Sequence, residues 1–273
     1  KKLNSWKKIG INRLSLGVQT FNDNLLKQLN RIHTSKDAIK SLNKIKNTFN
    51  NYSIDLMFGT PNSSGDSIKY DLSILKELSP PHVSIYNMTL EKRTVFYNLL
   101  KKKKISLPSE SSVLDQYDLI LNELEIFGYE NYEISNFAKK NFHSQHNSNY
   151  WNNKEYIGFG PSAHSYDKTF RYWNISDNKK YIELIDKEKK VYEKEELSRT
   201  EKINEYILTR IRTKKGVNQN ELLESFNFNL LKEREKELKL FKKEKLVKIE
   251  KNIISLTNEG KKICGYITEK ITY

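Results

Sequence analysis

Two short segments near the start of the chain alternate apolar with polar side chains. Residues 12–19 read Asn-Arg-Leu-Ser-Leu-Gly-Val-Gln, and residues 53–59 read Ser-Ile-Asp-Leu-Met-Phe-Gly. Successive side chains of a β-strand point to opposite faces, so the pattern predicts two strands, each with one apolar and one polar face. Apolar residues at positions 38, 42, 45 and 49 have the spacing of an amphipathic helix. Together the three segments predict a βαβ unit with parallel strands.

Polar residues on these two strands predict a site. A parallel strand that is covered on both faces is apolar on both sides, whereas Gln19 and Asp55 are polar. Barrels and open α/β sheets place their chemistry at the carboxyl ends of parallel strands. We therefore expect Gln19 and Asp55 to meet at a common site at that edge of the sheet.

The next segments extend the α/β pattern. A turn-rich loop over residues 59–65 leads to a helix predicted over 66–78, which two prolines end. Residues 82–89 read as a third parallel strand. Three βα units of this kind cannot close a barrel, so we expect an α/β fold that holds only part of one.

The pattern changes after residue 91. A helix is predicted over residues 109–128 and a strand over 132–137, whereas residues 138–174 show no clear periodicity and are rich in Asn, His, Gly and aromatic residues. A long irregular stretch inside a compact domain is more often functional than idle. We therefore expect residues 138–174 to contribute to function.

The end of the chain reads as a separate small α+β domain. Helices are predicted over residues 199–212, 218–226 and 231–241, and a β-hairpin is predicted over 246–256. Three helices and a β-ribbon are typical of a winged helix, which is most often a DNA-binding fold. The third helix carries three glutamates, which repel a phosphate backbone, so we expect no nucleic-acid partner.

The net charge of +14 and the pI near 9.4 would suit an anionic partner. However, the lysines are scattered among glutamates, and Lys, Asn, Ile and Tyr are all abundant, which is typical of an A/T-rich coding sequence. No run of 18 apolar residues and no signal peptide occurs. The single cysteine, Cys264, excludes an internal disulfide. We expect a cytoplasmic protein without a membrane span.

Several of these segments resemble the HemN/HemW group of radical S-adenosylmethionine (SAM) proteins. Three of them follow in the family's order, namely residues 13–21 (Arg-Leu-Ser-Leu-Gly-Val-Gln-Thr-Phe), 29–33 (Leu-Asn-Arg-Ile-His) and 54–61 (Ile-Asp-Leu-Met-Phe-Gly-Thr-Pro). The resemblance implies the later βα units of a partial radical-SAM (β/α) barrel over residues 1–175. It also implies a HemN-type, winged-helix-like domain over residues 176–273. The family's opening third has no counterpart, so we expect an N-terminally truncated chain.

The resemblance further implies which residues contact SAM. Gln19 would offer its amide to hydroxyl or carboxylate groups, and Asp55 would accept hydrogen bonds from ribose hydroxyls or the SAM ammonium. Arg31 would pair with a carboxylate in the bidentate geometry that suits Arg, and Thr89 matches a further SAM-contacting position. Two alternatives stay open at this stage. Asp55 could form a buried ion pair with Arg13, and Arg31 could be an ordinary surface arginine.

The family's iron–sulfur cofactor cannot be held by this chain. In radical SAM proteins a [4Fe-4S] cluster bound by Cys-x3-Cys-x2-Cys reduces SAM to a 5′-deoxyadenosyl radical. A four-iron cluster needs three or four cysteines, and the chain has one. We therefore expect no metal site in this chain, cluster ligands that lie outside it, and no radical chemistry from the chain alone.

Two histidines and two large aromatic residues lie close together in the irregular stretch. His143 and His146 have the His-x-x-His spacing of a metal pair, but no carboxylate or thiolate pattern completes a zinc site. An imidazole such as His146, beside Tyr150 and Trp151, suits a flat aromatic ligand. Imidazole can bind haem iron axially while aromatic rings stack on the macrocycle. A packed aromatic corner without a ligand is the alternative.

The same stretch resembles the HemW branch of the family. The motif His-Asn-x-x-Tyr-Trp, followed by Tyr-Ile-Gly-Phe-Gly-Pro-Ser-Ala-His-Ser, carries this likeness. It implies haem contacts from His146, Asn147, Tyr150 and Trp151, and delivery of haem to acceptor proteins, some of them membrane-associated. It also leaves room for a homodimer. The enzyme alternative is an oxygen-independent coproporphyrinogen III oxidase, and a third class is a basic winged-helix nucleic-acid binder.

Overall fold

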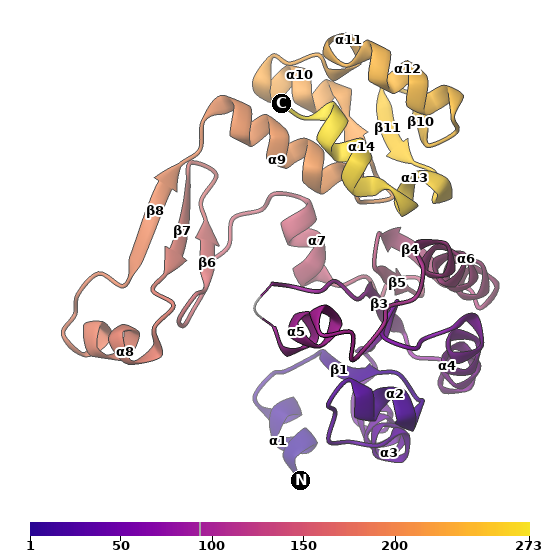
Figure 1. Ribbon diagram of the computed structural model, residues 1–273. Helices are drawn as coiled ribbons and strands as arrows, with labels where there is room; N and C mark the ends of the chain where they lie inside the picture. The colour runs from indigo at the N-terminus through magenta and orange to yellow at the C-terminus, as the bar shows by residue number, and fades with distance from the viewer. Residues whose placement is uncertain (93) are drawn as a thin grey trace. The chain divides into compact units, whose positions relative to one another are not determined.

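The first half of the chain folds around one open five-stranded sheet (Figure 1). We describe a computed structural model that covers residues 1–92 and 94–273. The sheet has the order β1-β2-β3-β5-β4, in which the first three strands are parallel and the last two antiparallel, so it is a partial barrel sheet and not a closed barrel. The strands are β1 (Leu14–Gln19), β2 (Tyr52–Phe58), β3 (His82–Asn87), β4 (Glu130–Glu133) and β5 (Asn136–Ala138).

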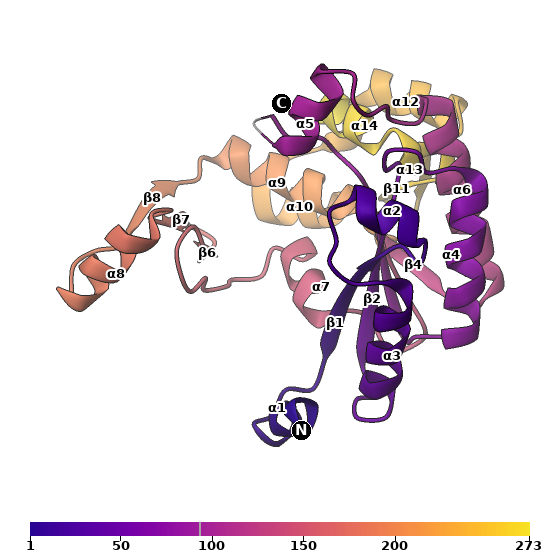
Figure 2. The ribbon, with the colours of Figure 1, turned by 60° about the horizontal axis from the view of Figure 1, so that its bottom comes forward.

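Helices α3 (Ser35–Lys46), α4 (Gly65–Leu78) and α6 (Glu110–Ile126) pack on one face of this sheet (Figure 2). Their apolar stripes and the apolar face of the strands form one core, because alternate strand residues point to the same side. The fully buried side chains of this core include Ile54, Leu75 and Leu124. The opposite face carries the polar residues of the strands.

Local sequence explains where two of these helices begin. Thr34 accepts a hydrogen bond from the backbone N–H of Asp37, and the Asp37 carboxylate accepts one from the backbone N–H of Thr34, which is a capping box at the start of α3. Ser64 and Ser67 form the equivalent reciprocal pair at the start of α4. Both caps satisfy backbone N–H groups that have no partner inside the helix.

Several predicted boundaries in this half differ from the structure. The third strand ends at Asn87, so Thr89 lies beyond it in a loop. The single strand expected over residues 132–137 is wrong, because Ile134 and Ser135 form a turn between β4 and β5. Three further short helices complete this half, namely α1 (Lys2–Lys8), α2 (Asp23–Gln28) and α5 (Val95–Lys101).

Contacts divide the described chain into two compact units, Lys1–His143 and Ser144–Tyr273. The second unit begins with α7 (Gln145–Trp151) and an antiparallel sheet of β6 (His164–Tyr166), β7 (Phe170–Asn174) and β8 (Tyr192–Glu196), with α8 (Asn178–Asp186) between the last two strands. The prediction that residues 138–174 are irregular is therefore wrong, because α7, β6 and β7 lie within them. The strands escaped notice because β7 is half-buried along its whole length and β8 is exposed along its whole length, so neither alternates.

The remainder of the second unit is helical with a small sheet of order β10-β11-β9. The expected set of helices and a hairpin is confirmed, and its core contains Ile207, Leu222 and Phe241. The domain boundary predicted at residue 175 stays a prediction, since the two compact units are defined by contacts and not by family domains. In the residues that the structure describes, no helix is long and apolar enough to cross a membrane. The elements are α9 (Arg199–Ile211), β9 (Val217–Asn218), α10 (Gln219–Phe226), α11 (Leu230–Glu233), α12 (Glu235–Lys243), β10 (Val247–Glu250), β11 (Ile253–Leu256), α13 (Asn258–Lys262) and α14 (Cys264–Ile271).

Candidate functional site

Asp55 lies at the centre of the polar face of the first sheet. Its strand partners are Gly17 on β1 and Ser84 on β3, so it sits in the middle of β2 and not at the carboxyl edge where we expected it. The Ser15 hydroxyl lies 2.9 and 2.8 Å from the two carboxylate oxygens, and the Ser53 hydroxyl lies 3.3 Å from one of them. The half-buried carboxylate is therefore held by hydroxyl donors from two strands.

The hydrogen bonds continue from Ser53 into the interior of the first unit. The Ser53 hydroxyl lies 2.8 Å from Nδ1 of His82, and Nε2 of His82 lies 2.7 Å from the Tyr132 hydroxyl. If Ser53 donates to Asp55, its oxygen accepts from Nδ1–H, and Nε2 then accepts from the Tyr132 O–H. Burial, together with the charges of Arg13 and His143, lowers the pKa of His82 to about 3, so the imidazole is neutral.

Arg13 does not neutralise Asp55 by direct contact. Among the described residues the two form no ion pair, and the buried Nε of Arg13 has no hydrogen-bond partner. Burial lowers the pKa of Arg13, while the nearby Tyr132 and Asp55 oppose that shift. The ion-pair alternative for Asp55 is therefore wrong, and the polar face keeps a guanidinium with an unused donor near a carboxylate.

Gln19 reaches this face by an irregular backbone. It ends β1 with φ of +66°, and the register shifts between Gly17 and Gln19, so that Gln19 pairs with Leu56. The side chain folds back over its own strand. With the amide oriented so that its nitrogen faces the two backbone carbonyl oxygens, the nitrogen donates to Gly17 O at 2.8 Å and to Val18 O at 3.2 Å. A Cβ on Gly17 would meet this amide at 3.0 Å. Gly17, the β1 partner of Asp55, thus leaves room for the Gln19 side chain.

Arg31 and Thr89 lie in exposed loops. Arg31 follows α2, and its backbone N–H donates to Leu26 O at 2.9 Å. Thr89 lies two residues beyond the end of β3. In the described part of the chain neither side chain forms a hydrogen bond or an ion pair, so the structure does not bring them to Asp55 by protein contacts.

Two buried polar side chains hold the loops around this face, and we had not predicted either of them. The carboxylate of Asp71 accepts from the Thr20 hydroxyl at 3.0 Å and from the Phe21 backbone N–H at 2.7 Å, and burial raises its pKa to about 6. The amide oxygen of Gln116 accepts from the Gly59 N–H at 3.1 Å. A polar residue on the apolar stripe of a helix was the signal that could have identified Asp71.

In the second unit, helix α7 presents a row of rings. His146 packs edge-on against Tyr150 with ring centroids 4.9 Å apart, and Tyr150 packs against Tyr156 at 4.7 Å. His146 is exposed and Tyr150 is 40% exposed, whereas Trp151 is half-buried. The buried indole Nε1 of Trp151 has no hydrogen-bond partner in the described structure. The helix therefore offers one accessible imidazole backed by aromatic rings.

His143 does not share the helical face of His146. Ser144 caps α7 by accepting from the Asn147 N–H at 3.3 Å, so the helix begins one residue after the cap and His143 lies outside it. The ring of His143 stacks on Tyr132 at 4.4 Å, and its Nε2 lies 3.2 Å from a carboxylate oxygen of Glu130. In the residues that the structure describes, no group of three His, Cys, Asp or Glu side chains could hold a metal ion.

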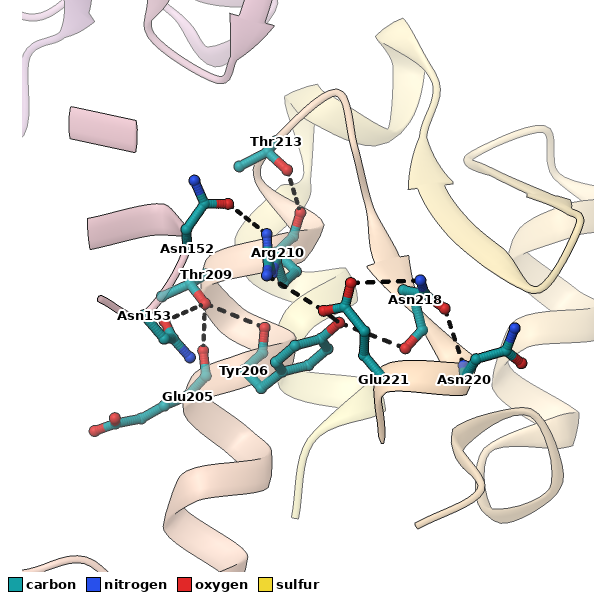
Figure 3. Close-up of polar contacts among 10 residues, drawn as sticks. All are labelled: Asn152, Asn153, Glu205, Tyr206, Thr209, Arg210, Thr213, Asn218, Asn220 and Glu221. Carbon is teal, nitrogen blue, oxygen red and sulfur yellow. Dashed lines mark hydrogen bonds and ion pairs between the residues drawn. The ribbon is translucent and has the colours of Figure 1, made fainter. Parts of the chain in front are cut away.

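The carboxyl end of α7 is fixed by helix α9 (Figure 3). Arg210 donates through Nη1 to the side-chain oxygen of Asn152. The Thr209 hydroxyl lies 2.9 Å from the side-chain amide oxygen of Asn153. On its other side Nη2 of Arg210 lies 3.3 Å from a carboxylate oxygen of Glu221. These contacts tie the residues that directly follow Trp151 to the core of the second unit.

The single cysteine does not fit an iron–sulfur cluster. Cys264 is buried in α14, and burial raises the pKa of its thiol, which opposes the thiolate that iron requires. Its neighbour is the Thr268 hydroxyl at 3.8 Å, not another sulfur. No step of radical chemistry can therefore be assigned to the described residues.

Comparison with known proteins defines the class. Residues 1–73 match the Radical SAM superfamily, and residues 197–262 match the HemN C-terminal domain. The solved structure of coproporphyrinogen III oxidase (HemN) from Escherichia coli superposes with a TM-score of 0.81 over 99% of this chain and 66% of that chain, at 21% sequence identity. The chain is thus a radical SAM protein with a HemN-type fold.

Sequence relatives narrow the class to one family. Heme chaperone HemW of Bacillus subtilis is 35% identical over 263 residues, which cover 96% of this chain and 69% of that protein. Heme chaperone HemW of Lactococcus lactis is 35% identical over 95% of this chain and 69% of that protein. This chain belongs to the HemW family of radical SAM proteins.

Proposed function

We propose that the chain acts in haem trafficking, binding haem and passing it to acceptor proteins. The observation that supports this proposal is α7, which presents the exposed imidazole of His146 against Tyr150 in a family whose relatives bear the name heme chaperone. A neutral imidazole is an axial ligand for haem iron, and an exposed site suits a cargo that must leave again. The likeness to HemN concerns the fold, so it does not favour the decarboxylase alternative.

Each residue of α7 has its own part in this proposal. His146 binds the iron or lies directly beside it, and Tyr150 and Trp151 form the aromatic wall against the macrocycle. Asn147, one residue along, offers an amide to polar groups of the ligand. The unpartnered indole N–H of Trp151 is a donor that a bound acceptor would satisfy after a small side-chain movement.

We further propose that the polar face of the first sheet holds SAM. Asp55 would accept from ribose hydroxyls or the ammonium group, with Gln19 and the unused donor of Arg13 nearby. Arg31 and Thr89 would join from their loops when SAM binds. In this superfamily SAM, bound beside a [4Fe-4S] cluster, supplies a 5′-deoxyadenosyl radical.

A haem titration followed by Soret absorbance tests the proposed haem site. His146→Ala should shift or abolish the Soret band, because it removes the iron ligand or its neighbour. His143→Ala is the matched control, since His143 lies outside α7 and should leave the band nearly unchanged. If both variants keep the wild-type band and affinity, the haem site lies elsewhere.

A further inference from the structure

Ser53 lies between two groups that compete for its single hydroxyl proton. Its oxygen lies 2.8 Å from Nδ1 of His82 and 3.3 Å from a carboxylate oxygen of Asp55. The Ser84 hydroxyl is a third neighbour at 3.4 Å. Ser53 and His82 are buried, so bulk water has little access to these bonds. A hydroxyl donates one hydrogen bond, so the direction of the Ser53 O–H decides the direction of every bond beyond it.

The carboxylate of Asp55 sets the direction of that O–H. A carboxylate only accepts hydrogen bonds. If the proton of Ser53 pointed at His82, a lone pair of Ser53 would face the carboxylate oxygen, and the two acceptors would repel each other. With the proton toward Asp55 the contact is a charge-assisted hydrogen bond, which is stronger than a bond between neutral groups. Ser53 therefore donates to Asp55.

This direction selects one tautomer of His82. The Ser53 oxygen is left to accept from His82, so the ring proton has to be on Nδ1. Nε2 is then the bare nitrogen, and it accepts from the Tyr132 hydroxyl at 2.7 Å. Burial lowers the pKa of His82 to about 3, so the ring carries one proton at neutral pH and the two tautomers are distinct.

The surroundings of His82 hold its ring in one place. On β3 it pairs with Ser53 of β2 on one side and with Ala138 of β5 on the other. The Tyr132 ring packs against the imidazole with centroids 5.7 Å apart. Both ring nitrogens are engaged, so the orientation of the imidazole is fixed by packing and by hydrogen bonds together.

We propose that His82 is a positioning residue of the SAM site: its Nδ1–H fixes the Ser53 hydroxyl as a donor to Asp55. Tyr132 supports this role by occupying Nε2. The inference rests on the proposed SAM site at the polar face of the first sheet. Ser15 bonds both oxygens of the same carboxylate, so Asp55 is oriented before a ligand arrives. An oriented acceptor loses less entropy when ribose hydroxyls or an ammonium group bind to it.

The tautomer of His82 is the first readout, and it needs no substitution in the protein that is measured. Proton–nitrogen correlation NMR of the chain with isotope-labelled histidines distinguishes a protonated ring nitrogen from a bare one. The His82 signals are those of the five histidines that disappear in a His82 variant. We expect a protonated Nδ1 and a bare Nε2 at neutral pH. A proton on Nε2 would overturn the inference.

Two variants of His82 separate positioning from structural support. The amide of His82→Asn lies where Nδ1 was and can still donate to Ser53, whereas the longer His82→Gln reaches the place of Nε2 and bonds Tyr132 instead. Each keeps one hydrogen bond and loses the other, so both should lose similar stability in urea unfolding. SAM binding, measured by calorimetry in a protein that contains the cluster ligands, should weaken about two- to tenfold in His82→Gln and less than about twofold in His82→Asn.

Ser53→Ala tests the same bond from its other side. It should weaken SAM binding as much as His82→Gln, and the double variant should bind no more weakly than Ser53→Ala, because both changes act through one hydroxyl. Equal SAM affinities of His82→Asn and His82→Gln, or additive losses in the double variant, would overturn the positioning role and leave the SAM site intact. Unchanged affinity in Asp55→Ala would instead overturn the SAM site itself, and the inference with it.

Discussion

The sheet face around Asp55 and the helix that carries His146 differ in how firmly the fold holds their side chains. Asp55 lies on the central strand of β1, β2 and β3, with hydroxyl donors from two strands and a core of fully buried residues behind it. His146 lies on a helix of seven residues that has no buried residue and is fixed mainly at its carboxyl end. One site is built into a sheet, and the other is mounted on the surface of a unit.

This difference suits two kinds of ligand. A cofactor that must be oriented for chemistry benefits from side chains whose positions are determined before it binds. A cargo that is handed on benefits from an accessible ligand that a second protein can approach. The comparison therefore predicts that changes to the core and the buried hydrogen bonds that support the first site lower stability, whereas changes to side chains that contact a ligand at either site lower affinity.

The largest effect is expected in the core beneath Asp55. Ile54→Ala removes a side chain that is 0% exposed, and it should lower the free energy of unfolding of the first unit by about 2–5 kcal/mol. Ile157→Ala in the second unit is the matched control, since this isoleucine is 75% exposed and should cost less than about 0.5 kcal/mol. Urea unfolding followed by circular dichroism measures both. Equal losses in the free energy of unfolding would mean that the core beneath Asp55 does not stabilise the first site more than the surface of the second unit stabilises α7.

The second effect is a pH dependence of the free energy of unfolding. It arises from His82, which hydrogen bonds link to Ser53 and Tyr132. The pKa of His82 is lowered to about 3, whereas a histidine in the unfolded chain titrates near 6.5. Between these values the unfolded state binds the extra proton, so stability is lost as the pH falls through this window. At pH 4 the contribution of His82 alone to the free energy of unfolding should be about 3 kcal/mol lower than at pH 7.

The matched measurement compares wild type with His82→Gln, which keeps hydrogen bonding without titrating. The difference between the two proteins is needed because Asp71 titrates in the same range with the opposite sign. Its pKa is raised to about 6, so its contribution to the free energy of unfolding is present at low pH and is lost as the pH rises toward 6. Urea midpoints between pH 4 and pH 7 should therefore diverge between the two proteins. Parallel curves would show that His82 is not held neutral.

Sequence patterns predicted the two sites unequally for a physical reason. Alternation along residues 12–19 and 53–59 identified the strands and the polar position of Asp55, because strand periodicity is a local property. The register shift at Gln19, the turn at Ile134 and the buried acceptor Asp71 depend on partners 30 or more residues away or on backbone irregularity. A local pattern can mark Asp71 as a buried polar residue on the apolar stripe of its helix, but it does not identify the partners of Asp71 or the irregular backbone.

The second unit was harder to predict because its elements are short or exposed. Helix α7 has seven residues, too few to show a helical period, and the aromatic strand β7 is half-buried on both faces. The residues His146, Tyr150 and Trp151 were found from their chemistry and from the family resemblance. The contacts of Asn152 and Asn153 with Arg210 and Thr209 were not found, since these partners lie more than 50 residues further along the chain.

The third prediction concerns SAM at the first site. In a protein that contains the cluster ligands, Asp55→Ala should weaken SAM binding by about 1–3 kcal/mol, the cost of losing a charge-assisted contact in a half-buried site. Calorimetric titration measures the change, and Asp115→Ala, which removes an exposed carboxylate on α6, serves as the matched control. Unchanged SAM affinity with a large fall in melting temperature would show that Asp55 is structural.

The smallest effect is expected at the aromatic wall of the second site. Trp151→Ala should weaken haem binding by about 1–2 kcal/mol, because stacking contributes affinity, and it should leave the Soret band in place, because the indole is not an iron ligand. Trp173→Ala is the matched control: this tryptophan lies in the same unit on β7, donates to Glu193 at 3.2 Å and is not part of α7. A Soret titration of both variants gives affinity and band position together. A shifted band at unchanged affinity would place Trp151 near the iron and away from the macrocycle wall. If both variants weaken haem binding equally, the loss reflects a general change in the second unit. The haem affinity of α7 would then depend on the fold of the whole unit and not on stacking by Trp151.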